Sequence, residues 1–283
     1  MHYNTLILSV VTFVYGLAAV LYVFSWVFRK EGPGRLASWV TLAACIGNAA
    51  GLAMRWYESY QIGSGYGHAP LSNIYESLTF FALTIGIIYL LVERRYQNRV
   101  IGMFALPLAF FALAYASFGT SDQIQPLIPA LKSNWLIAHV IACFIGYAAF
   151  GVAFGVSIMY LFQSNRSTET RQGGQSRMMD SAILDELTHQ LIMFGFLFLT
   201  VGIITGAVWA NSAWGRYWGW DPKETWSFVT WLIYAALLHF RMMRGWRGKR
   251  IAVLSIVGFA DVLFTYFGVN LLPGLHSYGA MKG

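Results

Sequence analysis

The chain has 283 residues, of which 57% are hydrophobic and only 11% are charged, and its mean hydropathy is +0.55. A soluble domain carries about 25% charged residues, so this composition excludes an ordinary soluble protein and indicates an all-α polytopic membrane protein. A net charge of +7 fits either nucleic-acid binding or a membrane topology signal, and the positions of the charges decide between them.

Eight apolar segments are long enough to cross a bilayer as helices, which takes about 20 residues each. They lie near residues 5–28, 36–56, 71–92, 99–118, 135–163, 185–209, 224–243 and 250–272. We therefore expect about eight transmembrane helices. They form a single integral membrane domain, residues 1–283, with no separate soluble domain.

Lysine and arginine gather in every second connection between these segments. The connections after the first, third, fifth and seventh segments hold 14 of the 19 basic residues. Positively charged connections stay on the cytoplasmic side of a membrane, so both termini are predicted to lie outside. The basic excess is then a topology signal, and no nucleic-acid partner is expected. The polar connection 164–184 is predicted to be a flexible cytoplasmic segment that loosely divides the chain after the fifth helix.

The first half of the chain offers few candidates for chemistry. Ser72 and Glu76 open the third helix with capping residues, and His68 is expected to have a role in the glycine-rich outer connection before it. Cys45 and Cys143 lie in apolar runs without a Cys-x-x-Cys spacing. We interpret both as small buried core residues rather than as redox or zinc-binding thiols.

Six of the eleven tryptophans fall within residues 209–231. A membrane-interface belt needs only one or two aromatic residues at each helix end. We therefore interpret residues 209–226 as an external tryptophan-rich loop that forms a flat aromatic surface for a large, planar, apolar ligand. Gly215 and Gly219 would let its backbone turn sharply. The loop is expected to end at residues 221–224, whose Asp, Pro and Glu suit the N-cap, N1 and N3 positions of a helix.

Two histidines are predicted at the depth of this loop. His139 lies near the outer end of the fifth helix, and His276 lies just beyond the eighth helix. Two neutral imidazoles that face each other can supply both axial ligands of a haem iron, and an iron porphyrin is a planar, apolar ligand. Arg216 or Lys223 would then meet the haem propionates.

Three other polar residues lie inside predicted spans. His239 comes 15 residues after Glu224, roughly 22 Å deeper along the seventh helix, and an ionisable side chain at that depth is a candidate ligand for a second, intramembrane haem. His189, near the inner start of the sixth helix, either pairs with His239 or is a polar residue of an amphipathic run. Asp261, at the middle of the eighth helix, should be paired or protonated, although the sequence does not identify its partner.

The run Trp209-Ala-Asn-Ser-Ala-Trp-Gly-Arg-Tyr-Trp-Gly-Trp-Asp-Pro-Lys-Glu-Thr-Trp226 closely resembles the tryptophan-rich signature of the CcsA/ResC family of System II cytochrome c biogenesis. Residues 70–77, 134–139, 238–241 and 276–278 also agree with that family, so the resemblance covers nearly the whole chain. The related CcmC proteins share such a loop but are shorter, usually with six spans.

The resemblance implies a protein that moves haem b across the membrane and presents it outside. It also implies that the protein is a haem lyase, which attaches that haem covalently to a Cys-x-x-Cys-His apocytochrome c. In this role it would act in complex with a ResB/CcsB-type membrane protein. His139 and His276 would ligate the outer haem, and His239 the intramembrane haem opposite a ligand from the partner. The predicted haem-contacting residues are Trp209, Trp214, Trp218, Trp220, Asp221, Trp226 and Arg216.

Other functions fit the same residues. A haem exporter or chaperone without synthase activity needs the same ligands, and a b-type haem electron carrier also uses membrane histidines. A transporter for another substrate is disfavoured because no pair of broken helices is evident. A nucleotide-binding loop is absent from the sequence, which excludes a self-contained ATP-driven pump. The compact chain favours a bacterial cell membrane over a thylakoid membrane.

Overall fold

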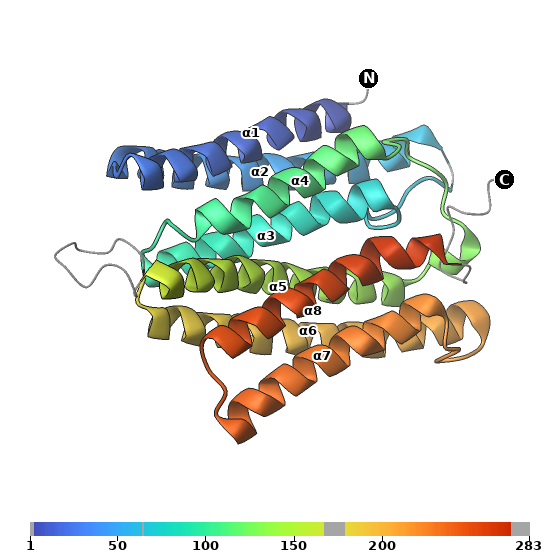
Figure 1. Cartoon of the computed structure of the whole chain (residues 1–283). Coiled ribbons are helices and arrows are strands. Elements are labelled where there is room, and N and C mark those ends of the chain that lie inside the picture. Colours follow the sequence, from blue (N-terminus) through green and yellow to red (C-terminus); the bar gives the residue numbers. More distant parts are fainter. Residues whose placement is uncertain (1–2, 64, 167–178, 273–283) are drawn as a thin grey trace. The chain divides into compact units, whose positions relative to one another are not determined.

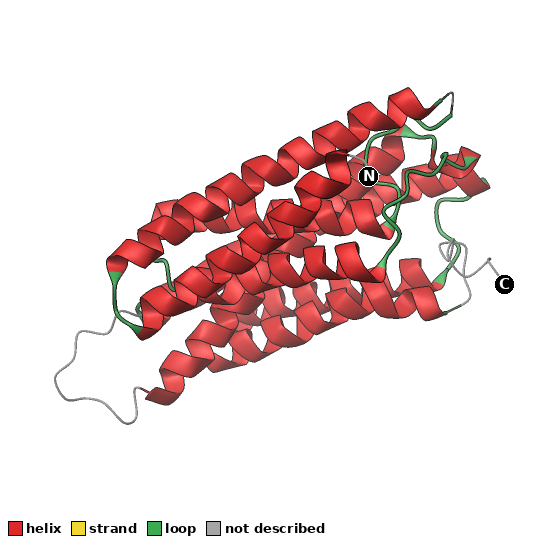
Figure 2. Ribbon diagram, turned by 90° about the horizontal axis from the view of Figure 1, so that it is seen from above, coloured by secondary structure: helices red, strands yellow, loops and turns green. Residues whose placement is uncertain are grey.

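The computed structural model describes residues 3–63, 65–166 and 179–272, and over these residues it is all-helical (Figure 2). The helices are α1 (Tyr3–Val27), α2 (Glu31–Ile62), α3 (Ile74–Tyr96), α4 (Gly102–Gly119), α5 (Asn134–Arg166), α6 (Ser181–Trp214), α7 (Pro222–Arg244) and α8 (Lys249–Phe267), with short 3-10 helices η1 (Pro129–Leu131) and η2 (Gly268–Leu271) (Figure 1). The predicted all-α architecture is confirmed.

The helices belong to two compact units, Met1–Lys132 with α1–α4 and Ser133–Gly283 with α5–α8. In the first unit, α1 packs against α2 and α4, and α3 packs against α2 and α4. In the second unit, α5 packs against α6 and α8, while α7 packs against α6 and α8. The division therefore follows the fourth helix, whereas the polar connection 164–184 had suggested a loose division after the fifth.

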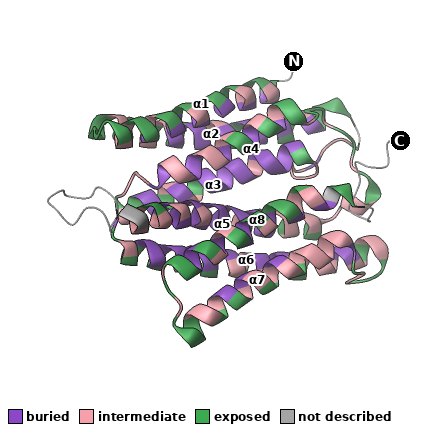
Figure 3. Ribbon diagram, viewed as in Figure 1, coloured by how far each residue is buried: buried purple, intermediate pink, exposed green. Residues whose placement is uncertain are grey.

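Seven of the described helices are long and apolar enough to cross a membrane. The eighth, α7, has charged residues in its first and last turns and carries His239 between them, and these residues lower its mean hydropathy. On α1, the large apolar side chains of Val10, Phe13, Leu17 and Val20 are exposed, and Figure 3 shows exposed segments along this helix. Such a surface suits contact with lipid chains, as expected of a multi-pass membrane protein.

Several helices continue beyond their predicted apolar spans. The structure extends α2 to Ile62, where the apolar pattern had suggested an end near 56, and extends α6 to Trp214 instead of 209. Hydropathy marks the part of a helix that crosses the membrane, whereas a helix ends where the backbone meets a stop signal. For α6 that signal is Gly215, which adopts a left-handed φ of 73° and donates its N–H to the Asn211 carbonyl.

Candidate functional site

The six tryptophans within residues 209–231 do not share one loop, which corrects the predicted loop at 209–226. Trp209 and Trp214 lie on the last turns of α6, and Trp226 is the fifth residue of α7. Only Trp218 and Trp220 lie in the connection 215–221 between the two helices. The helices extend this far because residues 207–214 contain no glycine or proline and because Pro222 already suits the first position of α7.

The indole rings meet edge to face instead of forming the predicted flat surface. Trp209 and Trp214 have ring centroids 4.8 Å apart at an interplanar angle of 65°. Trp218 and Trp220 are 5.6 Å apart at 89°. Aromatic quadrupoles favour such edge-on contacts over face-to-face stacking, so the site offers two edge-to-face aromatic pairs.

A capping box fixes the connection to α7, as the sequence predicts. The Asp221 carboxylate accepts a hydrogen bond of 3.0 Å from the Lys223 amide. The Glu224 Oε2 atom accepts bonds from the amides of Gly219 and Asp221 at 2.7 and 3.2 Å. These two amides flank Trp220, whose φ of 56° is left-handed and unfavourable for a residue with a side chain. The bonds on both sides of Trp220 therefore stabilise its strained backbone.

Gly219 does not make the sharp turn expected of it, because only Gly215 and Trp220 in this connection have a positive φ. Its role is steric: a Cβ atom on Gly219 would lie 2.7 Å from Cζ of Arg216. The exposed Arg216 side chain thus folds back over the loop backbone. The sequence had predicted a haem propionate contact for this guanidinium, which here lies beside Gly219.

His139 lies near the start of α5 with its ring against α6. Its Nδ1 atom is 2.7 Å from the carbonyl oxygen of Gly202. A carbonyl oxygen only accepts hydrogen bonds, so Nδ1 must donate and the lone pair of the neutral ring is on Nε2. This is the tautomer in which a histidine ligates a metal through Nε2 while a backbone carbonyl orients the ring.

Trp209 packs beside this imidazole. The two rings are nearly parallel, at 12°, with centroids 6.3 Å apart, and the Trp209 side chain is only 3% exposed. His139 is thus held by α6 at its Nδ1 edge and flanked by an indole. The other predicted outer ligand, His276, lies outside the described residues.

The deeper histidines lie where α6 and α7 run antiparallel. Arg241 pairs with Asp185 at 2.7 Å, and the Trp231 indole donates to Thr200 at 2.9 Å. These two cross-helix contacts define a register that places His239 at the level of His189. The His239 ring is exposed, whereas the Nδ1 atom of His189 is buried and has no hydrogen-bond partner within the described part of the chain.

The structure identifies the partner of Asp261 that the sequence left open. The Thr230 hydroxyl of α7 donates to Asp261 Oδ2 at 2.6 Å. The Thr265 hydroxyl lies 3.1 Å from the same Thr230 oxygen. The carboxyl group in α8 therefore belongs to a hydroxyl-lined contact between α7 and α8, which supports a structural role.

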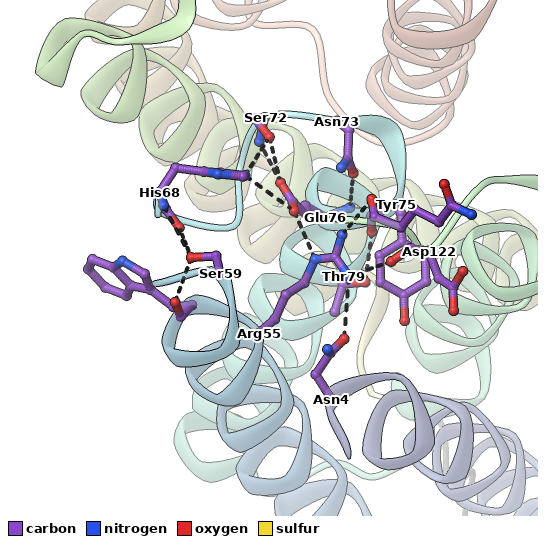
Figure 4. Close-up of polar contacts among 12 residues, drawn as sticks. Asn4, Arg55, Ser59, His68, Ser72, Asn73, Tyr75, Glu76, Thr79 and Asp122 are labelled. Carbon is purple, nitrogen blue, oxygen red and sulfur yellow. Dashed lines mark hydrogen bonds and ion pairs between the residues drawn. The ribbon is translucent and has the colours of Figure 1, made fainter. Parts of the chain in front are cut away.

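A buried polar network in the first unit, where α2 ends and α3 begins, was missed by the sequence reasoning. Arg55 Nε donates to Glu76 Oε1 at 2.8 Å, and both side chains are 1% exposed. The same guanidinium donates to Oδ1 of Asn4 and to the carbonyl oxygens of Asp122 and Gln123 (Figure 4). One arginine therefore joins α1, α2, α3 and the segment that follows α4.

His68 extends this network from the connection before α3. Its Nδ1 lies 2.6 Å from the Tyr66 carbonyl oxygen. Its Nε2 lies 3.0 Å from the Ser72 hydroxyl, and that hydroxyl is 2.8 Å from Glu76 Oε2 (Figure 4). The carbonyl can only accept, and the single hydroxyl proton of Ser72 bonds the carboxylate. Both ring nitrogens must therefore donate, so the geometry favours the imidazolium form of His68.

The electrostatic environment agrees with this protonation state. Burial by itself lowers the pKa of His68, but the hydrogen bond and negative charge of Glu76, together with the bond to the Tyr66 carbonyl, more than offset it and raise the pKa overall.

The predicted helix cap is confirmed only in part. Asn73 is the N-cap residue of α3, while Ser72 and Glu76 bond each other. A signal was present in the sequence, because an arginine and a glutamate inside apolar spans need partners.

Comparison with known proteins finds one family throughout. Residues 71–276 match the model of the Cytochrome C assembly protein family. A cytochrome c biogenesis protein CcsA of Parasynechococcus marenigrum (strain WH8102) is 43% identical over 82% of this chain and 82% of its own length. The CcsA proteins of Synechococcus sp. (strain CC9902) and Porphyra purpurea are 41% and 38% identical, and each match covers 96% of this chain and at least 95% of the relative.

The fold also matches a solved structure. The protein named Cytochrome c Heme Lyase CcmF superposes with a TM-score of 0.68 at 18% sequence identity. The match covers 95% of this chain but 49% of that chain. The likeness therefore concerns the helical architecture.

Proposed function

This chain belongs to the cytochrome C assembly protein family and acts in cytochrome c maturation, and we propose that it binds haem b at the outer ends of α5 and α6 and presents it for attachment to apocytochrome c. Haem is the substrate in this role. His139 and His276 are its two axial ligands, and the aromatic pairs around Trp214 and Trp218 contact the macrocycle.

The hydrogen bond between His139 Nδ1 and the Gly202 carbonyl carries this proposal. It puts the lone pair on Nε2, as iron ligation requires, and it fixes the plane of the ring. Haem iron in many proteins is held by an imidazole oriented in this way. The proximity of Trp209 adds an aromatic wall on one side of the ligand.

The connection between α6 and α7 supplies the second line of support. Trp220 is 67% exposed and Tyr217 is also exposed. Exposed aromatic side chains held on a fixed backbone favour contact with a large apolar partner. Arg216 offers a guanidinium at the same place, and guanidinium groups bind carboxylates such as haem propionates in bidentate geometry.

In the attachment reaction, each cysteine thiol of the apocytochrome adds across one haem vinyl group. A sulfur–carbon bond forms, the thiol hydrogen passes to the other vinyl carbon, and no net oxidation or reduction occurs. The residues described here supply ligation and positioning, which accelerate a reaction by holding the reacting groups together. Asp221 does not serve as an acid in this proposal because its carboxylate caps α7.

His239 is proposed to ligate the intramembrane haem. Its exposed ring on α7 suits a ligand whose opposing histidine comes from a ResB/CcsB-type partner chain.

The sequence alone favoured a bacterial cell membrane. The relatives from cyanobacteria and from Porphyra purpurea instead favour a thylakoid membrane, which we now propose.

The test is a visible spectrum of the detergent-purified protein co-expressed with a ResB-like partner. Wild type is compared with His139→Ala, His276→Ala and His239→Ala, and His2→Ala serves as a histidine control. We expect the outer variants to lose haem and covalent attachment to a Cys-x-x-Cys-His peptide, with recovery on adding imidazole. His239→Ala should lose a separate fraction of the haem.

Intact attachment in both outer variants, without any response to imidazole, would refute the outer site. Haem binding by the wild-type complex without attachment to the peptide would favour the exporter or chaperone function. Rapid reduction of the bound haem by quinol would instead favour an electron carrier.

A further inference from the structure

We propose that two glycines of α6, Gly202 and Gly206, are positioning residues for the His139 ligand. The Gly202 carbonyl sets the tautomer and the ring plane, and the missing side chain of Gly206 leaves the space that the imidazole occupies. This inference rests on the proposed role of His139 as a haem ligand.

The backbones of α5 and α6 approach closely along a row of glycines. A Cβ atom on Gly146 would lie 3.0 Å from the Gly195 carbonyl oxygen, and one on Gly195 would lie 2.6 Å from Phe150. A Cβ on Gly202 would lie 2.5 Å from the sulfur of Cys143. Small residues allow such close helix contacts inside membranes, and this contact brings the Gly202 carbonyl within reach of a side chain on α5.

At Gly206 the close contact is with the imidazole itself. A Cβ atom there would lie 2.6 Å from Nδ1 and 2.8 Å from Cε1 of His139. Real Cβ atoms essentially never approach another atom within 3.0 Å, so any side chain at position 206 forces the ring to move. Because the clash falls on the donating nitrogen, that movement breaks or lengthens the 2.7 Å bond to Gly202.

The two glycines are one helical turn apart and act on the same edge of the ring. The bond to the Gly202 carbonyl increases the electron donation of Nε2 to a bound metal, because the donor Nδ1–H is polarised. The Thr205 hydroxyl divides its hydrogen bond between this carbonyl at 3.0 Å and the Val201 carbonyl at 2.8 Å. Thr205 therefore takes part of the acceptor capacity that the Gly202 carbonyl offers to His139.

The experiment uses the full chain with its co-expressed partner and compares Gly206→Ala with Gly195→Ala. Gly195 lies in the same row of glycines and its substitution clashes with Phe150, so it controls for helix packing without touching His139. In Gly206→Ala we expect outer-site haem occupancy, measured per folded protein, to fall at least about tenfold. Added imidazole should restore the low-spin spectrum. In Gly195→Ala the haem that remains per folded protein should have the wild-type spectrum.

A second variant avoids any steric clash. Thr205→Val removes the competing hydroxyl, which should strengthen the His139 bond to Gly202 and lower the midpoint potential of the outer haem. This variant tests the inference even if Gly206→Ala does not fold.

The outcomes separate the inference from the proposed function. If His139→Ala abolishes the outer haem signal while Gly206→Ala keeps the wild-type spectrum, or Thr205→Val leaves the potential unchanged, the positioning role is overturned. Equal loss in Gly195→Ala and Gly206→Ala would also overturn it, because packing alone would explain both. If His139→Ala retains the outer haem signal, the proposed function fails and the positioning role fails with it.

Discussion

Arg55 and Glu76 form an ion pair of 2.8 Å in which both side chains are almost completely removed from solvent. Arg55 also lies 4.9 Å from the centre of the Tyr75 ring, so its charge is enclosed on several sides. The desolvation of two buried charges is costly, and a buried pair often stabilises a fold no better than apolar residues of the same volume. The pair therefore contributes a specific arrangement of the segments that Arg55 joins rather than a large gain in stability.

Replacing only one partner should be far more damaging than replacing both. We expect Arg55→Met to destabilise the protein by about 3–5 kcal/mol, because it leaves the Glu76 carboxylate buried without its cation. The double variant Arg55→Met with Glu76→Leu should recover much of that loss. Thermal unfolding in detergent, followed by intrinsic tryptophan fluorescence, measures both. Additive losses in the double variant would show that the two side chains do not interact.

The first unit should lose stability as the pH rises. His68 has a raised pKa in the fold because the effect of Glu76 and the Tyr66 carbonyl exceeds that of burial. A histidine whose pKa is higher in the folded than in the unfolded protein stabilises the fold when it is protonated. This stabilisation is fully present below the unfolded-state pKa of about 6.5 and is lost as the pH rises through the folded-state pKa.

Unfolding temperatures of wild type and His68→Asn between about pH 5 and 9 test this expectation. The wild type should fall towards the variant as the pH increases. An identical pH dependence in the two proteins would show that His68 does not bind the proton responsible. Ser72→Ala should reduce the pH dependence, because it removes the hydroxyl that links the ring to Glu76.

The sequence correctly predicted the features that depend only on residues close together in the chain. The cap at Asp221 was correct because capping chemistry is complete within four residues. The buried state of Cys45 and Cys143 was correct because each lies in an apolar run. The end of α6 was wrong, because hydropathy fades near 209 while helical backbone continues to the first residue that stops it, at Gly215.

Contacts between segments far apart in the chain could not be predicted from the sequence. Arg55 and Glu76 belong to different helices separated by a glycine-rich connection, and no periodicity pairs them. The carbonyl that orients His139 belongs to Gly202, and a backbone acceptor has no signature in residue type. The edge-on geometry of the tryptophans likewise depends on how α6 and α7 place their ends, since residue types alone specify neither angle nor distance.

Trp209 should support haem binding through its ring rather than through its indole nitrogen. Trp209→Phe keeps an aromatic face beside His139 and should retain most of the outer haem. Trp209→Leu removes the ring contact and should reduce occupancy, with an aromatic contribution of about 0.5–1.5 kcal/mol, or roughly two- to tenfold. Haem content per folded protein, from the reduced visible spectrum, measures the difference. Equal haem content in the two variants would show that the Trp209 ring does not contribute to haem binding.

Glu224 should matter more than an ordinary capping residue. Glu224→Ala removes the acceptor for the amides of Gly219 and Asp221. Loss of a helix cap costs about 1 kcal/mol, and the strained Trp220 backbone should relax as well. We expect a small fall in unfolding temperature together with a larger fall in haem occupancy. Pro222→Ala, which affects the same turn but neither bond, is the control, and an equal effect there would contradict a specific role of the carboxylate.

The connection between α6 and α7 also has a fixed length. Gly215 closes α6 through its bond to Asn211, and Asp221 opens α7, so both ends of residues 215–221 are tied to helices. Surface loops usually tolerate extra residues, but here one added residue would turn Trp218 away from Trp220 or detach Gly219 from Glu224. Its length is therefore fixed, and insertion scanning should find it among the connections between helices that tolerate added residues least.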